Sequence, residues 1–190
     1  MGTIGFMTVN STTLTIIIIA AIVVVLIVVA LAARRAKSAR LEKRFGPEYD
    51  RAIRETGDRT AAERQLEQRE ARVRKFHIAE LPAGARERYA EEWRTVQSRF
   101  VDRPEGALGE ADRLVTNVMR DRGYPIEEFD QRVADISADH PNVTQHYRAA
   151  HDIAARTERG EVSTEDLRQA MVHYRALFND LLGTPERKNT

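Results

Sequence analysis

A run of twenty uncharged residues, Leu14 to Ala33, most constrains how this chain can fold. It reads LTIIIIAAIVVVLIVVALAA, and Thr15 is its only polar residue. A helix of this length, rising 1.5 Å per residue, matches the ~30 Å hydrocarbon core of a bilayer. Valine and isoleucine are poor helix formers in water, but in lipid a single span satisfies its backbone amides only as a helix. The sequence therefore predicts a transmembrane helix at 14–33.

A cleaved signal peptide is the alternative for this segment, because Ala30-Leu31-Ala32 resembles a cleavage site. Two features favour a retained anchor instead. Residues 1–13 contain no Lys or Arg, whereas a signal peptide begins with a basic region, and the apolar run exceeds the usual ~7–15 residues. Export of the remaining chain after cleavage at Ala32 stays open as the second interpretation.

The residues that flank the apolar run differ in charge and so predict its orientation. Six basic residues follow it within eleven positions, namely Arg34, Arg35, Lys37, Arg40, Lys43 and Arg44. The positive-inside rule places that side in the cytoplasm. We therefore expect a single-pass protein with a short extracytoplasmic amino terminus, 1–13, and a cytoplasmic part, 34–190. Six basic residues also fall within the range of ~4–8 that binds anionic lipid headgroups, so these lipids are a second expected partner.

The charge beyond this basic cluster has the opposite sign. From Phe45 to Thr190 there are 24 basic and 28 acidic residues, a net charge of −4. A nucleic-acid-binding domain carries a clustered excess of basic residues, so we expect no nucleic-acid partner. The chain contains no cysteine, which excludes disulfides, a thiol nucleophile and cysteine-based metal sites.

The cytoplasmic part shows helical periodicity without the alternation of strands, so the fold class is all-α. Apolar stripes and caps predict helices at 47–56, 60–76, 83–101, 105–122, 126–138, 142–159 and 164–182. The stripe of 60–76 is thin, which predicts a mainly solvated helix opened by Asp58 or Thr60 as its cap, with a capping box from Thr60 to Glu63. We expect a charged juxtamembrane segment at 34–81, a helical bundle at 82–182 with its last helix capped by Ser163, and a loose tail at 183–190.

The sequence contains none of the common catalytic or cofactor motifs. Phosphate-cradling glycine patterns, a nucleophile elbow and the metal-binding pairs His-Glu-x-x-His and Glu-x-x-His are all missing from it. We therefore expect no cofactor, no metal and no catalytic residues, and the sequence leans away from an enzyme without settling the question.

One repeated tripeptide is a candidate ligand or partner site. His-Tyr-Arg occurs as His146-Tyr147-Arg148 and again as His173-Tyr174-Arg175. In an antiparallel hairpin about Gly160, residues whose numbers sum to about 320 lie side by side, so the two triplets should face one another. Two tyrosines among histidines and arginines are able to bind a small anion or an acidic helix. The favoured interpretation is that both tyrosines lie on apolar stripes as core aromatics with satisfied hydroxyls, flanked by solvated histidines and arginines.

Three further segments carry a resemblance to known sequences. They are Arg44 to Arg51 (RFGPEYDR), Glu91 to Val101 (EEWRTVQSRFV) and Met119 to Pro125 (MRDRGYP). The chain is similar to a family of uncharacterised bacterial proteins that have one amino-terminal membrane helix and a helical domain. The resemblance implies a location in the bacterial cytoplasmic (inner) membrane. It implies no activity, partner or site residue.

The sequence therefore favours a non-enzymatic interaction or scaffold module, tethered at the inner face of the membrane and serving an unidentified protein partner. The alternative is a small-ligand sensor or an enzyme that uses the paired His-Tyr-Arg segments.

Overall fold

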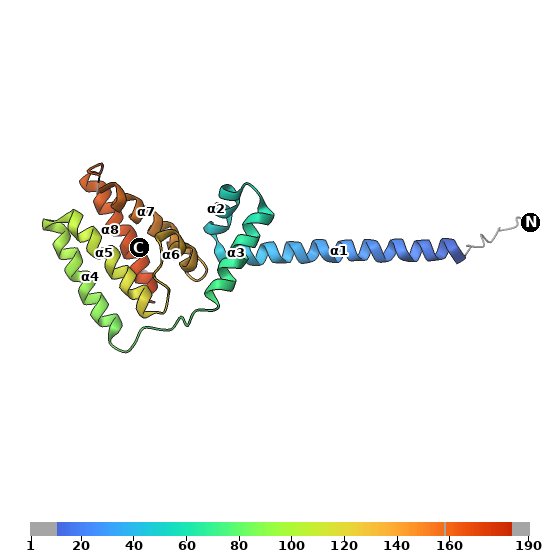
Figure 1. Cartoon of the computed structure of the whole chain (residues 1–190), viewed down its shortest axis with the longest axis horizontal. Helices are drawn as coiled ribbons and strands as arrows, with labels where there is room; N and C mark the ends of the chain where they lie inside the picture. The colour runs from blue at the N-terminus through green and yellow to red at the C-terminus, as the bar shows by residue number, and fades with distance from the viewer. Residues whose placement is uncertain (1–10, 158, 184–190) are drawn as a thin grey trace, which may run out of the picture. The chain divides into compact units, whose positions relative to one another are not determined.

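The computed structural model describes residues 11–157 and 159–183 (Figure 1). Within them the elements are α1 (Ser11–Phe45), α2 (Pro47–Thr56), α3 (Arg59–Val73), α4 (Ala85–Asp102), α5 (Pro104–Asp121), α6 (Phe129–Ile136), α7 (Pro141–Thr157) and α8 (Thr164–Leu181). No strand occurs in these ranges, so the all-α prediction is confirmed. Contacts divide the chain after Arg40 into two units. Residues 1–10 and the expected tail beyond Gly183 lie outside the described residues.

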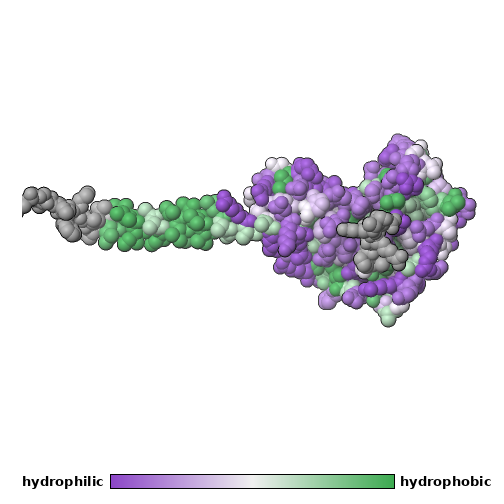
Figure 2. Space-filling view, turned by 180° about the vertical axis from the view of Figure 1, so that it is seen from behind, coloured by the Kyte–Doolittle hydropathy of each residue, from purple (hydrophilic) through white to green (hydrophobic). Residues whose placement is uncertain are grey.

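The first unit consists of helix α1 as far as Arg40. Its large apolar side chains from Leu14 to Leu31 are each between 47 and 62% exposed, and they appear as a continuous apolar surface in Figure 2. The helix is long and apolar enough to cross a membrane. It does not end at Ala33, where the apolar run ends, but continues without a break through the basic cluster to Phe45.

The second unit contains a small core made by the end of α1, α2 and α3. Its buried side chains are Leu41, Phe45, Tyr49, Ala52, Ala62, Leu66 and Val73, together with Ala138 from the bundle. Helix α2 begins at Pro47 and ends at Gly57, whose φ of +67° suits the left-handed turn there. The predicted juxtamembrane segment is therefore folded against the bundle, and its surface is mainly hydrophilic (Figure 2).

The expectations for α3 are met in part. Asp58, one of the two expected caps, accepts hydrogen bonds from the backbone amides of Thr60 and Ala61, so the expected capping box at Thr60 was wrong. Glu63 is buried instead and accepts a 2.8 Å hydrogen bond from the Tyr49 hydroxyl. Glu70 is also buried, and the helix is less solvated than its thin apolar stripe predicted.

The larger core lies among α4 to α8 and includes the apolar stripes expected for them. Trp93 of α4 stacks on Phe178 of α8 with ring centroids 4.8 Å apart. The predicted capping box at the start of α8 is confirmed, because Ser163 and Asp166 each accept a hydrogen bond from the other's backbone amide. Helix α6 is shorter than expected, because the backbone of Glu128 is extended and the helix begins only at Phe129.

Candidate functional site

The two His-Tyr-Arg segments lie at the same height on α7 and α8, as the hairpin arithmetic predicted. The Nδ1 atoms of His146 and His173 are 2.8 Å apart, and the ring centroids are 5.0 Å apart. Such a contact is a hydrogen bond only when one ring donates and the other accepts through an unprotonated nitrogen. Burial and, to a smaller extent, the neighbouring His146 lower the pKa of His173. Both effects favour an uncharged His173 in the folded protein.

The two tyrosines lie in the bundle core. Tyr147 and Tyr174 are both fully buried, and the Tyr174 hydroxyl donates a 3.1 Å hydrogen bond to Asp112 of α5. The Tyr147 hydroxyl has no hydrogen-bond partner among the described residues. Burial, reinforced by the charge of Asp112, raises the pKa of both hydroxyls. This placement supports the interpretation of the tyrosines as core aromatics, but only the Tyr174 hydroxyl is satisfied as expected.

The two arginines of the segments point to different parts of the domain. Arg148 donates a 2.6 Å hydrogen bond to Glu48 of α2. Arg175 is exposed and borders a shallow hollow of about 130 Å³ with Phe100 of α4 and Met171 of α8. The structure thus brings the two histidines together, and it does not gather the six residues into one pocket.

A polar groove lies where four helices meet. Helix α2 contacts α3 and α7, and α6 contacts the same two helices, so the four form a ring. The groove has two adjoining parts of about 600 and 410 Å³, which share Arg51 and Arg148. The charged side chains that line it are five arginines (Arg51, Arg54, Arg69, Arg72 and Arg148) and three carboxylates (Glu55, Asp130 and Asp152).

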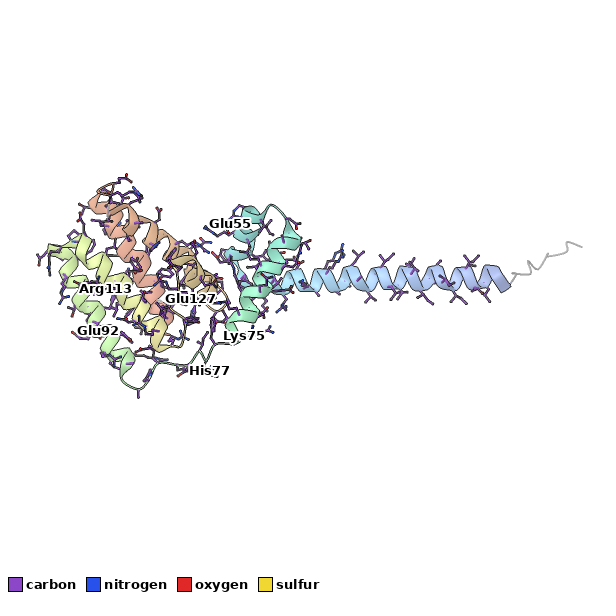
Figure 3. The ribbon with its side chains drawn as sticks, viewed as in Figure 1. Glu55, Lys75, His77, Glu92, Arg113 and Glu127 are labelled. Atoms are coloured by element: carbon purple, nitrogen blue, oxygen red, sulfur yellow. The ribbon has the colours of Figure 1, made fainter. Side chains whose placement is uncertain are left out.

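Helical spacing explains how these arginines converge. Arg51 and Arg54 are three residues apart on α2, as are Arg69 and Arg72 on α3, and residues at that spacing share one face of a helix. Arg148 reaches the groove from α7. Figure 3 shows side chains of α2 and α3 facing the α6–α7 region, with Glu55 on α2 and Glu127 beside α6 labelled.

A buried carboxylate orients two of the guanidinium groups. Glu48 is 1% exposed, in the first turn of α2, where the helix dipole favours an acidic side chain. One of its oxygens accepts the 2.6 Å hydrogen bond from Arg148, and the other lies 3.8 Å from Arg69. Burial lowers the pKa of Arg69, partly offset by the charge of Glu48 and deepened by that of Arg148. The Glu48 carboxylate is therefore shared by two guanidinium groups, so Glu48, Arg69 and Arg148 together carry a net positive charge.

A second buried carboxylate holds Arg72. Asp135 of α6 is fully buried and accepts hydrogen bonds of 2.9 Å from Arg72 and 2.8 Å from Gln131. Arg72 also donates a 2.7 Å hydrogen bond to Glu127. These contacts fix the guanidinium of Arg72 between α3 and α6.

Sequence reasoning missed all of this groove except Arg148. The helix at 60–76 was expected to be mainly solvated, and the pattern of 47–56 gave no role to Glu48 or to the arginines of α2. The available signals were the two i,i+3 arginine pairs on consecutive short helices. Nothing local indicated that α6 and α7 would close against them.

The predicted basic cluster is divided by the structure. Arg34, Arg35, Arg40 and Lys43 are exposed on α1, and Lys37 is partly exposed. Arg44 belongs to the second unit, and its guanidinium lies 3.3 Å from buried Glu70 and 3.5 Å from Asp139. Arg44 thus joins α1 to α3, a role that the sequence did not indicate.

No cluster of three or more potential metal ligands occurs among the described residues. Comparison of the chain with protein-family models, with curated proteins and with solved structures gave no match. The interpretation of this protein therefore depends on its own residues.

Proposed function

We propose that this protein is a membrane-anchored, non-enzymatic interaction module. In this proposal α1 crosses the cytoplasmic membrane of a bacterium once, and residues from Leu41 onward form a cytoplasmic domain that holds a protein partner near the inner face. The observation that carries the proposal is the exposure of α1. Its apolar side chains from Leu14 to Leu31 are about half exposed or more, and a bilayer is the surrounding that covers such a helix on all sides.

The charges that flank the apolar run support the proposed orientation. Basic residues follow the run and none precedes it in residues 1–13. Arg34, Arg35, Lys37, Arg40 and Lys43 continue the same helix beyond the bilayer, where each contributes about 1 kcal/mol of attraction to anionic lipids. Arg44 is excluded from this lipid-binding set because it pairs with Glu70 and Asp139.

The state of the buried polar groups favours interaction over catalysis. Buried Glu48, Glu70 and Asp135 each pair with arginine and join helices of the domain. The tyrosines of the two triplets are packed in the core. Catalytic acids and bases usually stand in a cleft within reach of a substrate, and these groups are engaged in holding the fold.

Two fusions test the location and orientation. Carboxyl-terminal fusion to a fluorescent protein that matures only in the cytoplasm should give fluorescent membranes, whereas fusion to an enzyme that is active only in the periplasm should be inactive. The reverse pattern would contradict the orientation. Amino-terminal sequencing of the mature protein separates the anchor from a cleaved leader, because a sequence that starts at Ala33 would show release of the domain.

Crosslinking the intact protein in membranes, followed by affinity purification, tests the interaction role. The matched control is the chain without residues 41–190, which keeps the anchor and loses the domain. A partner captured by the full chain and lost from the control supports the proposal. Capture of the same proteins by both would show that the anchor alone associates with them.

A further inference from the structure

The four-helix ring of α2, α3, α6 and α7 encloses charges where helices usually enclose apolar side chains. Buried ion pairs stabilise a fold less than apolar packing of the same volume, because both charges lose their hydration. A ring closed by Glu48, Asp135 and three arginines is thus a costly way to join helices. Arg69, Arg72 and Arg148 line the groove above it, so these three cations are accessible to a ligand from solvent.

The guanidinium groups of the groove keep N–H donors that their carboxylate partners do not use. An arginine has five N–H donors. Glu48 takes one donor of Arg148, Asp135 and Glu127 take two of Arg72, and Arg54 has no hydrogen bond or ion pair recorded in the described part of the chain. Guanidinium groups held from behind by carboxylates are preorganised for an anion.

The net charge of the groove differs from that of the domain. Residues 41–190 contain 26 basic and 29 acidic residues, a net charge of −3. The groove lining has five arginines against three carboxylates, a net charge of +2, and three of the five arginines also pair with carboxylates outside the lining, namely Glu48, Asp135 and Glu127. Where the two parts of the groove meet, Arg51 and Arg148 line both parts and pair with Glu55 and Glu48, and Arg54 stands beside them without a carboxylate partner among the described residues.

The uncharged side chains that line the groove indicate which groups the rest of the ligand carries. Gln65, Gln68, Gln131 and Gln145 supply amides that donate and accept hydrogen bonds. The apolar lining is limited to Ala134 and Ala149, so an amphipathic helix or an acyl chain has little surface to cover. A volume of about 600 Å³ lies within the range of small-molecule sites.

We propose that this groove binds a small phosphate ester with a hydroxyl-bearing body. Its phosphate lies among Arg51, Arg54 and Arg148, and its hydroxyls bond to the glutamines. The site gives the proposed interaction module a ligand to respond to. It does not depend on the membrane location, so the two proposals fail separately.

Inorganic pyrophosphate is the probe for the phosphate subsite. Calorimetric titration of the detergent-solubilised full chain, with sodium chloride at matched ionic strength as the blank, should show saturable binding. The first test variant is Arg54→Glu, chosen because Arg54 has no carboxylate partner among the described residues. The second is Gln68→Glu, which changes one exposed amide to a carboxylate of the same size. Arg54→Glu should weaken binding about tenfold, because it places a negative charge beside the phosphate. Gln68→Glu should weaken binding less, because it adds its negative charge to the part of the groove that holds the hydroxyl-bearing body.

Two exposed residues outside the groove supply the controls. Arg64→Glu on α3 and Gln97→Glu on α4 make the same changes of charge and should bind as the wild type does. The proposal is overturned by the lack of saturable binding, by equal weakening in controls and test variants, or by preferential binding of an acidic peptide. Because Gln68 lies on the surface, its variant keeps the test valid if Arg54→Glu does not fold.

Nanodiscs distinguish a soluble ester from a lipid headgroup. Discs of phosphatidylcholine with or without phosphatidylinositol 4-phosphate are compared as the surroundings of the full chain. If the phosphoinositide raises the apparent Kd for pyrophosphate, the headgroup occupies the groove. An unchanged Kd assigns the groove to a soluble ester. Both outcomes support a phosphate site, provided that Gln68→Glu weakens the binding.

Discussion

The guanidinium of Arg148 on α7 lies 2.6 Å from a carboxylate oxygen of Glu48 on α2, although the two residues are 100 positions apart. This contact joins the helices that follow α1 to the bundle. Arg72 with Asp135, and Arg44 with Asp139, make further charged links between the same parts. The joint therefore combines ion pairs with the apolar packing of Ala138 against the small core.

Replacement of Glu48 should destabilise this joint. In Glu48→Gln the shape is kept, but Arg148 and Arg69 lose the carboxylate that they share in a buried position. Loss of one partner of a buried ion pair costs about 3 kcal/mol or more. The free energy of unfolding is measured by urea titration of the full chain in detergent, with fluorescence of Trp93, the single tryptophan, as the signal.

Glu55→Gln is the matched control, because Glu55 lies on the same helix and its 2.7 Å ion pair with Arg51 is exposed. Exposed pairs contribute about 0.5 kcal/mol, so this variant should be nearly as stable as the wild type. Equal stability of the two variants would show that the buried position of Glu48 has no energetic significance.

Gly123 should tolerate no side chain. Its φ is +93°, and an added Cβ would lie 2.4 Å from the backbone oxygen of His77. Gly123→Ala therefore combines backbone strain with displacement of the linker before α4, and we expect a loss of about 3 kcal/mol in the free energy of unfolding. Gly57 has a φ of +67° with open space around it, so Gly57→Ala should lose only about 1 kcal/mol. Similar losses would mean that the linker moves away freely.

The apolar periodicity was sufficient to predict most of the fold. Stripes such as Tyr89, Trp93 and Val96 lie in the core because a helix that buries one face needs little more than that spacing. The register of α7 and α8 was also predictable, since a short turn at Gly160 leaves a hairpin few choices. The contact of His146 with His173 follows from it.

The groove was not predictable from the same pattern. A buried Glu48 and an exposed glutamate look alike in a sequence, and only the approach of Arg148 from α7 makes its burial tolerable. The same holds for Glu63 and Glu70, which are buried in a helix that was expected to be mainly solvated. Long-range ion pairs leave no periodic signal, so sites built from them require the three-dimensional structure.

The histidine pair should make stability depend on pH. The pKa of His173 is lowered from 6.5 in the folded state, so the unfolded chain binds the proton more readily. Stability is then complete above pH 6.5 and decreases as the pH falls below it, because protonation favours the unfolded chain. A doubly protonated pair also loses its hydrogen bond, at a cost of about 1 kcal/mol.

Comparison of variants isolates this effect from other titrations. Between pH 7.5 and 5.5, His173→Gln should lose less stability than the wild type, as measured by thermal unfolding of the full chain. His77→Gln is the control, because His77 is exposed, and its pH dependence should match that of the wild type. If all three proteins showed the same dependence, the His146–His173 contact would have no part in it.

Charges at the centre of α1 should remove the protein from membranes. Ile22→Arg, Val24→Arg and Leu26→Arg together add about 9 kcal/mol to the free energy of insertion, because arginine at the middle of a span costs about 3 kcal/mol. This penalty is comparable with the whole favourable contribution of the remaining apolar residues. Ultracentrifugation after alkaline extraction should therefore find the triple variant largely in the supernatant. The control exchanges the same residues as Ile22→Leu, Val24→Leu and Leu26→Ile and should stay in the pellet, and retention of both proteins would count against α1 as the anchor.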